Sequence, residues 1–110
     1  MEISRHKEQI INLPLANDDY FEIFNKDNAV NFRSGLVTLE PGKEVGSHNT
    51  EDYEECIIVL EGEGEIETEG AGRRPISHGQ VGYNPPHTQH NVINTGNRKM
   101  KYIYLVVKTI

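Results

Sequence analysis

The stretch GKEVGSHNTEDYEECIIVLEG, from Gly42 to Gly62, contains His48 and Glu55, whose side chains are of types that bind metals in many proteins. A second stretch, GQVGYNPPHTQHNVIN from Gly79 to Asn94, carries a third, His90. Both consist of short apolar runs bounded by glycine, proline or asparagine, a pattern typical of β-strands separated by turns. Two imidazoles and one carboxylate form the facial donor set of non-haem Fe(II) oxygenases, and the same donors also suit Zn(II), Mn(II) or Ni(II).

The rest of the chain continues this pattern. No segment shows a sustained period near 3.6 residues, and short alternating runs predict an all-β chain. At 110 residues, with no internal linker or repeat, the chain is predicted to form one domain over 1–110. Even spacing of short strands favours a barrel or jelly roll over an open sheet. The predicted strands are Ile10–Leu13, Tyr20–Asn25, Phe32–Leu39, Glu55–Leu60, Gly64–Glu69, Gln80–Tyr83, Gln89–Asn94 and Lys101–Lys108.

The two stretches resemble the two sequence motifs of the cupin family, with motif one over 42–62 and motif two over 79–94. The resemblance runs from Leu39 to Asn94 and includes the β-rich tail of the chain. It implies a cupin-type double-stranded β-helix, a jelly-roll barrel. It also implies one divalent transition metal (Fe, Zn, Mn or Ni), bound by His48, Glu55 and His90.

Two positions depart from the family's pattern. Thr50 stands where motif one usually has a second histidine, and His87 stands where motif two usually has a glycine. The usual set of three histidines and one glutamate is therefore reduced to two histidines and one glutamate. His87 has three interpretations: it replaces the missing ligand, it acts as an acid–base group at the mouth of the barrel, or it is an exposed loop histidine.

Alternation along a strand assigns the faces of the segment around Glu55. If Glu55 points into the barrel, Ile57 and Val59 do the same, while Cys56 points outward. A slip of one residue would turn Glu54 inward instead. The family's spacing to the following glycine selects Glu55 as the inward carboxylate. A carboxylate in such an apolar interior needs a partner, and a divalent cation would hold it ionised.

His90 shares a strand face with Asn94, so its imidazole is predicted to enter the same chamber as the Glu55 carboxylate. A metal-bound imidazole usually passes its other N–H to a nearby acceptor. Asn94 and Tyr83 are the candidates for that acceptor. Tyr83 and His87 are also the candidate catalytic residues, as proton-transfer groups at the rim of the site.

Five glutamates alternate with other residues from Glu61 to Glu69, so they fall on one face of a strand. We expect this face to be a solvated acidic surface, which also discourages edge-to-edge aggregation. The opposite face carries mostly small residues, which we expect to leave volume for a cavity: Gly62, Gly64, Ile66 and Thr68.

Composition excludes several classes of function. The net charge of −6 argues against nucleic acid as a partner, because binding to nucleic acid depends on basic side chains that neutralise phosphates. The longest apolar run, Ile57–Leu60, is far too short to span a membrane, and the N-terminus lacks the layout of a signal peptide. We therefore expect a cytoplasmic protein with no membrane partner. Cys56 is the only cysteine, so no internal disulfide forms.

Two hypotheses about function follow, and both have a small molecule as the partner. In the first, the protein is a metal-dependent enzyme of dioxygenase, isomerase or lyase type that acts on a small oxygen-donor molecule. In the second, it is a non-enzymatic binding module for a sugar or another small molecule, with a degenerate or empty metal site. Under either hypothesis, resemblance to cupins implies a homodimer in which the N-terminal strands, with Ile10–Leu13, pair with the partner's sheet.

Overall fold

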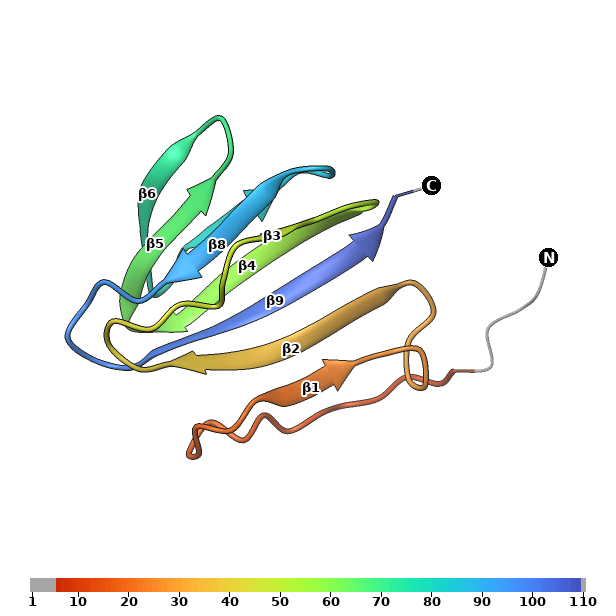
Figure 1. The fold of residues 1–110 in the computed structure, drawn as a ribbon. Coiled ribbons are helices and arrows are strands. Elements are labelled where there is room, and N and C mark those ends of the chain that lie inside the picture. The colour runs from red at the N-terminus through yellow and green to blue at the C-terminus, as the bar shows by residue number, and fades with distance from the viewer. Residues whose placement is uncertain (1–5, 110) are drawn as a thin grey trace.

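The computed structural model describes residues 6–109, which contain nine strands joined by turns and loops and no helix (Figure 1). They form two antiparallel sheets, one of five strands in the order β1-β2-β9-β4-β7 and one of four in the order β3-β8-β5-β6. The all-β prediction is thus confirmed, and residues 6–109 contain no helix able to cross a membrane. The strands are β1 (Phe21–Phe24), β2 (Phe32–Leu39), β3 (His48–Asn49), β4 (Tyr53–Glu61), β5 (Glu63–Thr68), β6 (Gly72–Ser77), β7 (Val81–Asn84), β8 (Gln89–Ile93) and β9 (Met100–Lys108).

The predicted strands agree with the observed ones except at three places. Seven of the eight predicted strands are present, and β2 has the predicted bounds. The strand predicted over Ile10–Leu13 is wrong, because this segment pairs with no strand and the Ile10 side chain is 96% exposed. The short β3 and the whole of β6 were not predicted. Strand β6 contains Pro75, and a proline is tolerated in an edge strand such as β6.

The core lies between the two sheets and follows the predicted alternation. On β4, Glu55, Ile57 and Val59 are buried, whereas Cys56 and Ile58 on the other face are partly exposed. The predicted register, with Glu55 inward, is therefore confirmed. The inward side chains of both sheets form one apolar cluster: Leu39, Ile57, Val59, Ile66, Ile76, Val92, Met100 and Tyr102.

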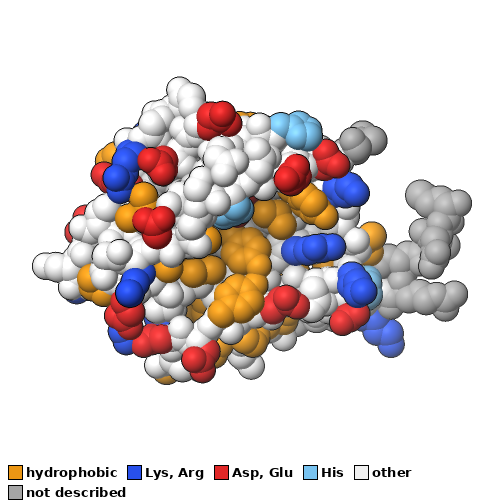
Figure 2. Space-filling view, in the orientation of Figure 1, with side chains coloured by type: hydrophobic (Ala, Val, Ile, Leu, Met, Phe, Trp, Pro, Cys, Tyr) orange, Lys and Arg blue, Asp and Glu red, His pale blue; other side chains and the backbone are white. Residues whose placement is uncertain are grey.

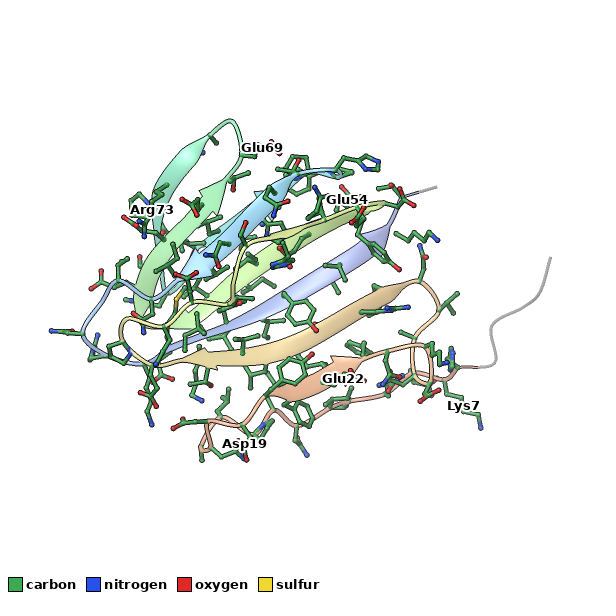
Figure 3. All side chains as sticks on the ribbon, viewed as in Figure 1. Lys7, Asp19, Glu22, Glu54, Glu69 and Arg73 are labelled. Atoms are coloured by element: carbon green, nitrogen blue, oxygen red, sulfur yellow. The ribbon has the colours of Figure 1, made fainter. Side chains whose placement is uncertain are left out.

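The acidic strand β5 presents its glutamates outward as predicted. Glu63 and Glu67 are exposed, and Glu65 pairs with Arg73 on β6, which projects outward at the rim in Figure 3. The inner face of this strand leaves no cavity at Gly64, whereas Ile66 and Thr68 at its other end line one. A Cβ atom on Gly64 would lie 2.3 Å from the carbonyl oxygen of Ile93, so the glycine permits close backbone approach instead.

The N-terminal segment 6–20 runs as an extended strap along the edge strand β1 (Figure 1). One anchor is Lys101, only 4% exposed, whose ammonium group donates to the carbonyl oxygen of Asn17 and to the hydroxyl of Thr38. A second anchor is Tyr20, which stacks on Tyr104 of β9 and shares a hydrogen bond between the two hydroxyls. The strap thus covers part of the five-stranded sheet of its own chain.

Candidate metal centre

The fold brings the three predicted metal ligands together from three strands and both sheets. His48 on β3 and His90 on β8 are direct partners in the antiparallel ladder, and Glu55 enters from β4 in the opposite sheet. One nitrogen of each imidazole and one carboxylate oxygen all lie within 4.8 Å of one another. A cluster of this size can surround a single ion.

His48 is oriented by the backbone beside it. Its Nδ1 lies 2.8 Å from the carbonyl oxygen of Gly46. Because a carbonyl oxygen only accepts, Nδ1 carries the proton and Nε2 keeps its lone pair free for a metal. Gly46 adopts a φ of 109°, a conformation that favours glycine. The His48 ring also packs edge-on against His90, with ring centroids 4.1 Å apart.

Asn84, which sequence reasoning missed, joins the other two ligands. Its side chain is fully buried, and its amide nitrogen donates to Glu55 Oε1 at 3.0 Å and lies 3.3 Å from His90 Nδ1. The amide oxygen in turn accepts from the hydroxyl of Thr68 at 2.9 Å. Asn84 is the direct ladder partner of Glu55 across β7 and β4. This buried amide therefore orients the Glu55 carboxylate, and it could have been found from the register of these strands.

The protonation states of the buried groups suit a metal site. Burial raises the pKa of Glu55, although the hydrogen bond from Asn84 and the nearby His48 act in the opposite direction. Burial, together with His48, lowers the pKa of His90 from 6.5 to about 4. His90 is therefore neutral at physiological pH, as a ligand must be. A carboxylate whose charge is destabilised by burial is itself stabilised by a cation, so these residues fit a divalent metal.

Thr50, at the position of the family's second histidine, has a different task. Its buried hydroxyl donates to the carbonyl oxygen of Pro85 at 2.7 Å and accepts from the backbone N–H of Thr88 at 3.0 Å. It thereby ties the loop of motif one to the loop of motif two. The donor set is two imidazoles and one carboxylate, with no fourth protein ligand at this position.

His87 lies in the loop between β7 and β8, but its side chain does not approach the three candidate ligands. Its side chain is 69% exposed, and its Nε2 lies 3.6 Å from Asp52 Oδ1 at the surface. Its φ of 52° and the hydrogen bond from its N–H to the Glu51 carbonyl hold it in this turn. This placement matches the exposed-loop interpretation of His87.

Tyr83 is also placed away from the three ligands. Its hydroxyl donates to Glu54 Oε1 at 2.9 Å, and the ring is 59% exposed on the outer face of β7. Asn94 is buried, but its amide donates to the carbonyl oxygens of Leu39 and Arg98 and so closes a loop. Neither residue therefore contacts a candidate ligand, as was predicted for them. Asn84 does so instead, because its side chain points inward from β7.

Two tyrosines of β9 share the chamber with Glu55. Tyr102 is 3% exposed, yet its hydroxyl has no hydrogen-bond partner among residues 6–109. Tyr104 packs against the same core. Burial and then the negative charge of Glu55 raise the pKa of Tyr102, whereas burial and then the hydrogen bond with Tyr20 raise the pKa of Tyr104. Both tyrosines thus lie on the same inner face of the five-stranded sheet as Glu55.

A cation lies in the same row of the sheet as the candidate metal ligand Glu55. Ladder pairs place Arg33, Val106 and Glu55 side by side on β2, β9 and β4. Strands are ~4.8 Å apart, so the Cα atoms of Arg33 and Glu55 are about 10 Å apart. The guanidinium group lies 6.0 Å from the ring centroid of Tyr53 and forms no ion pair with any residue in 6–109. Figure 2 shows this side of the molecule as a hollow lined by apolar side chains, with a histidine at its edge.

The fold and the site define a class of protein, a small double-sheet β-barrel with a candidate mononuclear metal centre in its interior. Residues 35–107 match the cupin domain family, so the chain belongs to the cupin family. The cupin-type double-stranded β-helix predicted from the two motifs is therefore confirmed.

Similar proteins support the same fold. An oxalate-binding protein of Thermotoga maritima is 32% identical over 71 residues, which cover 64% of this chain and 58% of that protein. The matched part thus spans little more than half of that relative. A crystal structure of a predicted oxalate decarboxylase from the same organism superposes with a TM-score of 0.69 at 24% identity, covering 81% of this chain and 78% of the other. An RmlC-like cupin of Methanocaldococcus jannaschii superposes with a TM-score of 0.78 at 13% identity, covering 92% and 91%.

Proposed function

We propose that this protein is a mononuclear metal-binding cupin that holds a small dicarboxylate, such as oxalate, at its metal. The observation that carries the proposal is the cluster of His48, Glu55 and His90 inside the barrel. When bound, the metal supplies open coordination positions and Lewis acidity to an oxygen-donor ligand. The similarity to an oxalate-binding protein supports a dicarboxylate as the ligand.

The residues around the metal ligands have separate roles in this proposal. Asn84 holds the Glu55 carboxylate in place, and the Gly46 carbonyl holds the His48 ring. Arg33, in the same row as Glu55 and without an acidic partner, attracts the negative charge of the ligand. Tyr102 contributes a hydroxyl that is free to donate a hydrogen bond.

A second candidate function is catalysis of dioxygenase, isomerase or lyase type. The facial set of two histidines and one carboxylate favours it, because that set leaves positions for both a substrate and a further small molecule. The placement of Tyr83 and His87 outside the donor cluster gives the proposed catalytic residues no direct contact with it. Assays of oxalate consumption and of oxygen uptake by the metal-loaded protein separate turnover from binding.

The proposal is tested by calorimetric titration of the metal-loaded protein with oxalate. The double variant Glu55→Ala/His90→Ala should contain no metal by elemental analysis and should give no oxalate heat. Arg33→Gln should keep its metal but bind oxalate about tenfold more weakly, the loss expected for one charge-assisted contact. Arg98→Gln removes an exposed cation elsewhere and should change neither quantity. Oxalate binding that is unaffected by removal of the metal would overturn the proposal.

The homodimer and the cytoplasmic location also remain proposals. Support for a dimer comes from large apolar side chains at the surface, including Ile10, Leu60 and Val81, which are 96%, 40% and 65% exposed. Burial of such residues against a second copy would remove apolar area from water. Light scattering at several concentrations measures the oligomeric state, and a monomer at all of them would contradict the dimer.

A further inference from the structure

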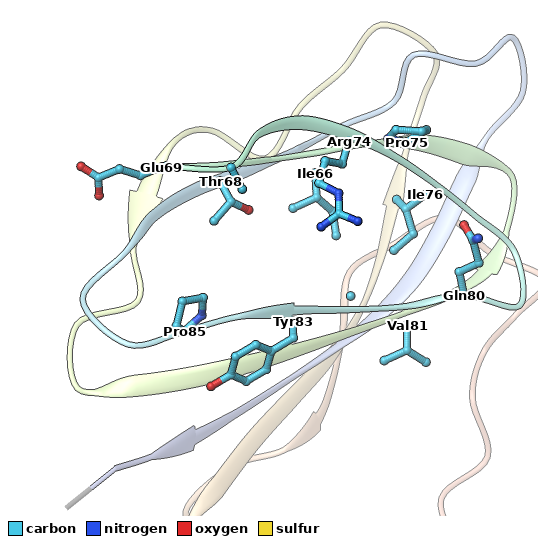
Figure 4. Close-up of a pocket in the computed structure, with 13 residues that line it drawn as sticks. Ile66, Thr68, Glu69, Arg74, Pro75, Ile76, Gln80, Val81, Tyr83 and Pro85 are labelled. Carbon is cyan, nitrogen blue, oxygen red and sulfur yellow. The ribbon is translucent and has the colours of Figure 1, made fainter.

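A second cavity lies at the edge of the barrel, away from the hollow of Figure 2. It lies between the β5–β6 hairpin of one sheet and β7 of the other (Figure 4). Strands β6 and β7 are the last strands of their sheets and are not paired with each other, so the barrel is open between them. The cavity has a volume of about 700 Å³. This volume is within the range of pockets that hold small molecules.

The walls of this edge pocket are mainly apolar. Ile66 and Ile76 form its inner wall, and Val81 and Pro85 lie along β7 and the loop that follows. The Val81 side chain, like that of Tyr83, points away from these two isoleucines in Figure 4, so β7 contributes Gly82 to the inner wall. A ligand with an apolar body would remove the apolar surface of these walls from water, which is favourable.

The polar feature of the pocket is the guanidinium group of Arg74. Arg74 is the ladder partner of the buried Ile66, so its side chain is on the inner face of β6 and extends into the pocket (Figure 4). It forms no ion pair or hydrogen bond with any residue in 6–109. Its neighbour Arg73 is on the opposite face and is paired with Glu65 at 2.9 Å. One of two adjacent arginines is thus neutralised at the surface, and the other lacks a counter-charge beside apolar walls.

The acidic residue of the lining does not supply that counter-charge. Glu69 lies at the end of the pocket, and Figure 4 shows its carboxylate directed away from Arg74. Its Oε1 accepts from the backbone N–H of Gln89 at 3.3 Å. The field inside the pocket is therefore positive near Arg74.

We infer that the edge pocket binds a small amphipathic carboxylate. The carboxylate forms a bidentate pair with the Arg74 guanidinium, whose planar fork matches it, and the apolar body packs against Ile66, Ile76 and Pro85. This site is distinct from the metal centre, but the two share a wall. Thr68 lines the edge pocket and donates to Asn84, which orients Glu55. A ligand in the pocket therefore lies two hydrogen bonds from a metal ligand.

The inference is tested by NMR titration of the full-length ¹⁵N-labelled protein with benzoate and with hexanoate, and with benzamide as the uncharged analogue. We expect saturable shifts of the backbone amides of Ile66, Ile76 and Gly82. Arg74→Gln should weaken the binding of benzoate at least about tenfold, whereas the matched variant Arg73→Gln should leave it unchanged. Benzamide should bind the wild type about as weakly as benzoate binds Arg74→Gln.

The metal-site variant Glu55→Ala/His90→Ala separates this site from the proposed function. It should bind benzoate with the affinity of the wild type, whether or not the metal proposal is correct. Loss of benzoate binding in that variant would assign the acid to the metal and overturn the inference. Shifts that do not saturate, or equal affinities in Arg74→Gln and Arg73→Gln, would overturn it as well.

Discussion

At the scale of single residues, the candidate metal centre depends on groups that hold the ligands as much as on the ligands themselves. His48 is directed by a backbone carbonyl, and Glu55 is directed by the fully buried Asn84. Thr68 in turn orients the Asn84 amide, so that its nitrogen faces the carboxylate. Such partners commonly contribute to metal affinity because they fix the ligand's orientation and protonation state.

The two fully buried asparagines provide a matched pair of variants. Asn84→Ala should weaken divalent metal binding about 10- to 100-fold, because Glu55 loses the donor that orients it. Asn94→Ala should destabilise the fold, because the amide that bonds Leu39 and Arg98 is lost, but should leave metal affinity near that of the wild type. Competition with a chromogenic chelator measures the affinities, and urea denaturation measures the stabilities. Equal metal affinities in the two variants would contradict the role of Asn84.

The lowered pKa of His90 predicts how the stability of the metal-free protein depends on pH. The pKa is about 4 in the folded state against ~6.5 in the unfolded state, so the unfolded chain binds more protons between these values. The contribution of His90 to stability is therefore fully present above pH 6.5 and is lost as the pH falls toward 4. Its slope is at most about 1.4 kcal/mol per pH unit. The raised pKa of Glu55 contributes a slope of the opposite sign.

Two measurements isolate the effect of His90. NMR of the imidazole resonances in the folded metal-free protein should give a pKa near 4 for His90. Urea denaturation between pH 4.5 and 7.5 should show a shallower pH dependence in His90→Gln than in the wild type. A His90 pKa near 6.5 in the folded protein would refute the prediction.

At the scale of elements, the loops of the two motifs are fastened to each other by Thr50. Its hydroxyl bonds the Pro85 carbonyl and the Thr88 N–H, and its own N–H donates to the Thr88 carbonyl. These contacts fix the loop that leads from His48 to β4 against the loop that leads from β7 to His90. The family's second ligand position has thus become a structural contact in this chain.

Replacement of Thr50 should therefore affect stability more than metal binding. Thr50→Val leaves the Thr88 N–H without its acceptor and should cost about 1–3 kcal/mol of unfolding free energy. Thr50→Ser keeps the hydroxyl and should cost less. In both variants the metal affinity should stay within a few-fold of the wild type. A large loss of metal in Thr50→Val with stability unchanged would show that Thr50 is a ligand after all.

At the scale of the whole molecule, the space between the two sheets opens to the surface on two sides. On one side, Figure 2 shows the hollow that has a histidine at its edge. On the other side, β6 faces β7 and forms the edge pocket. The hydrogen bonds from Thr68 to Asn84 and from Asn84 to Glu55 connect the two through the interior. Ligands at the two places thus share one rigid wall, through which any coupling between them would act reciprocally.

The sequence by itself determined most of the strands and indicated the candidate ligand set. Alternating runs between glycine and proline turns predicted eight strands, and seven of these are present in the structure. The spacing of motif one selected Glu55 over Glu54 as the inward carboxylate. These features are local, because side-chain parity and turn chemistry are properties of a few neighbouring residues. The homodimer, the cytoplasmic location and the small-molecule ligand were inferred from composition and from resemblance to cupins, and they stay predictions.

Only the tertiary structure decided which polar residues surround the ligands. Asn84 reaches Glu55 because β7 pairs with β4 in one particular register, while Tyr83, one residue earlier, points to the outside. Arg73 and Arg74 look alike in the sequence, yet the β5–β6 ladder turns one to a surface glutamate and the other into the edge pocket. Such placements depend on pairings between strands distant in sequence, and a shift of one residue reverses the face of every side chain on a strand.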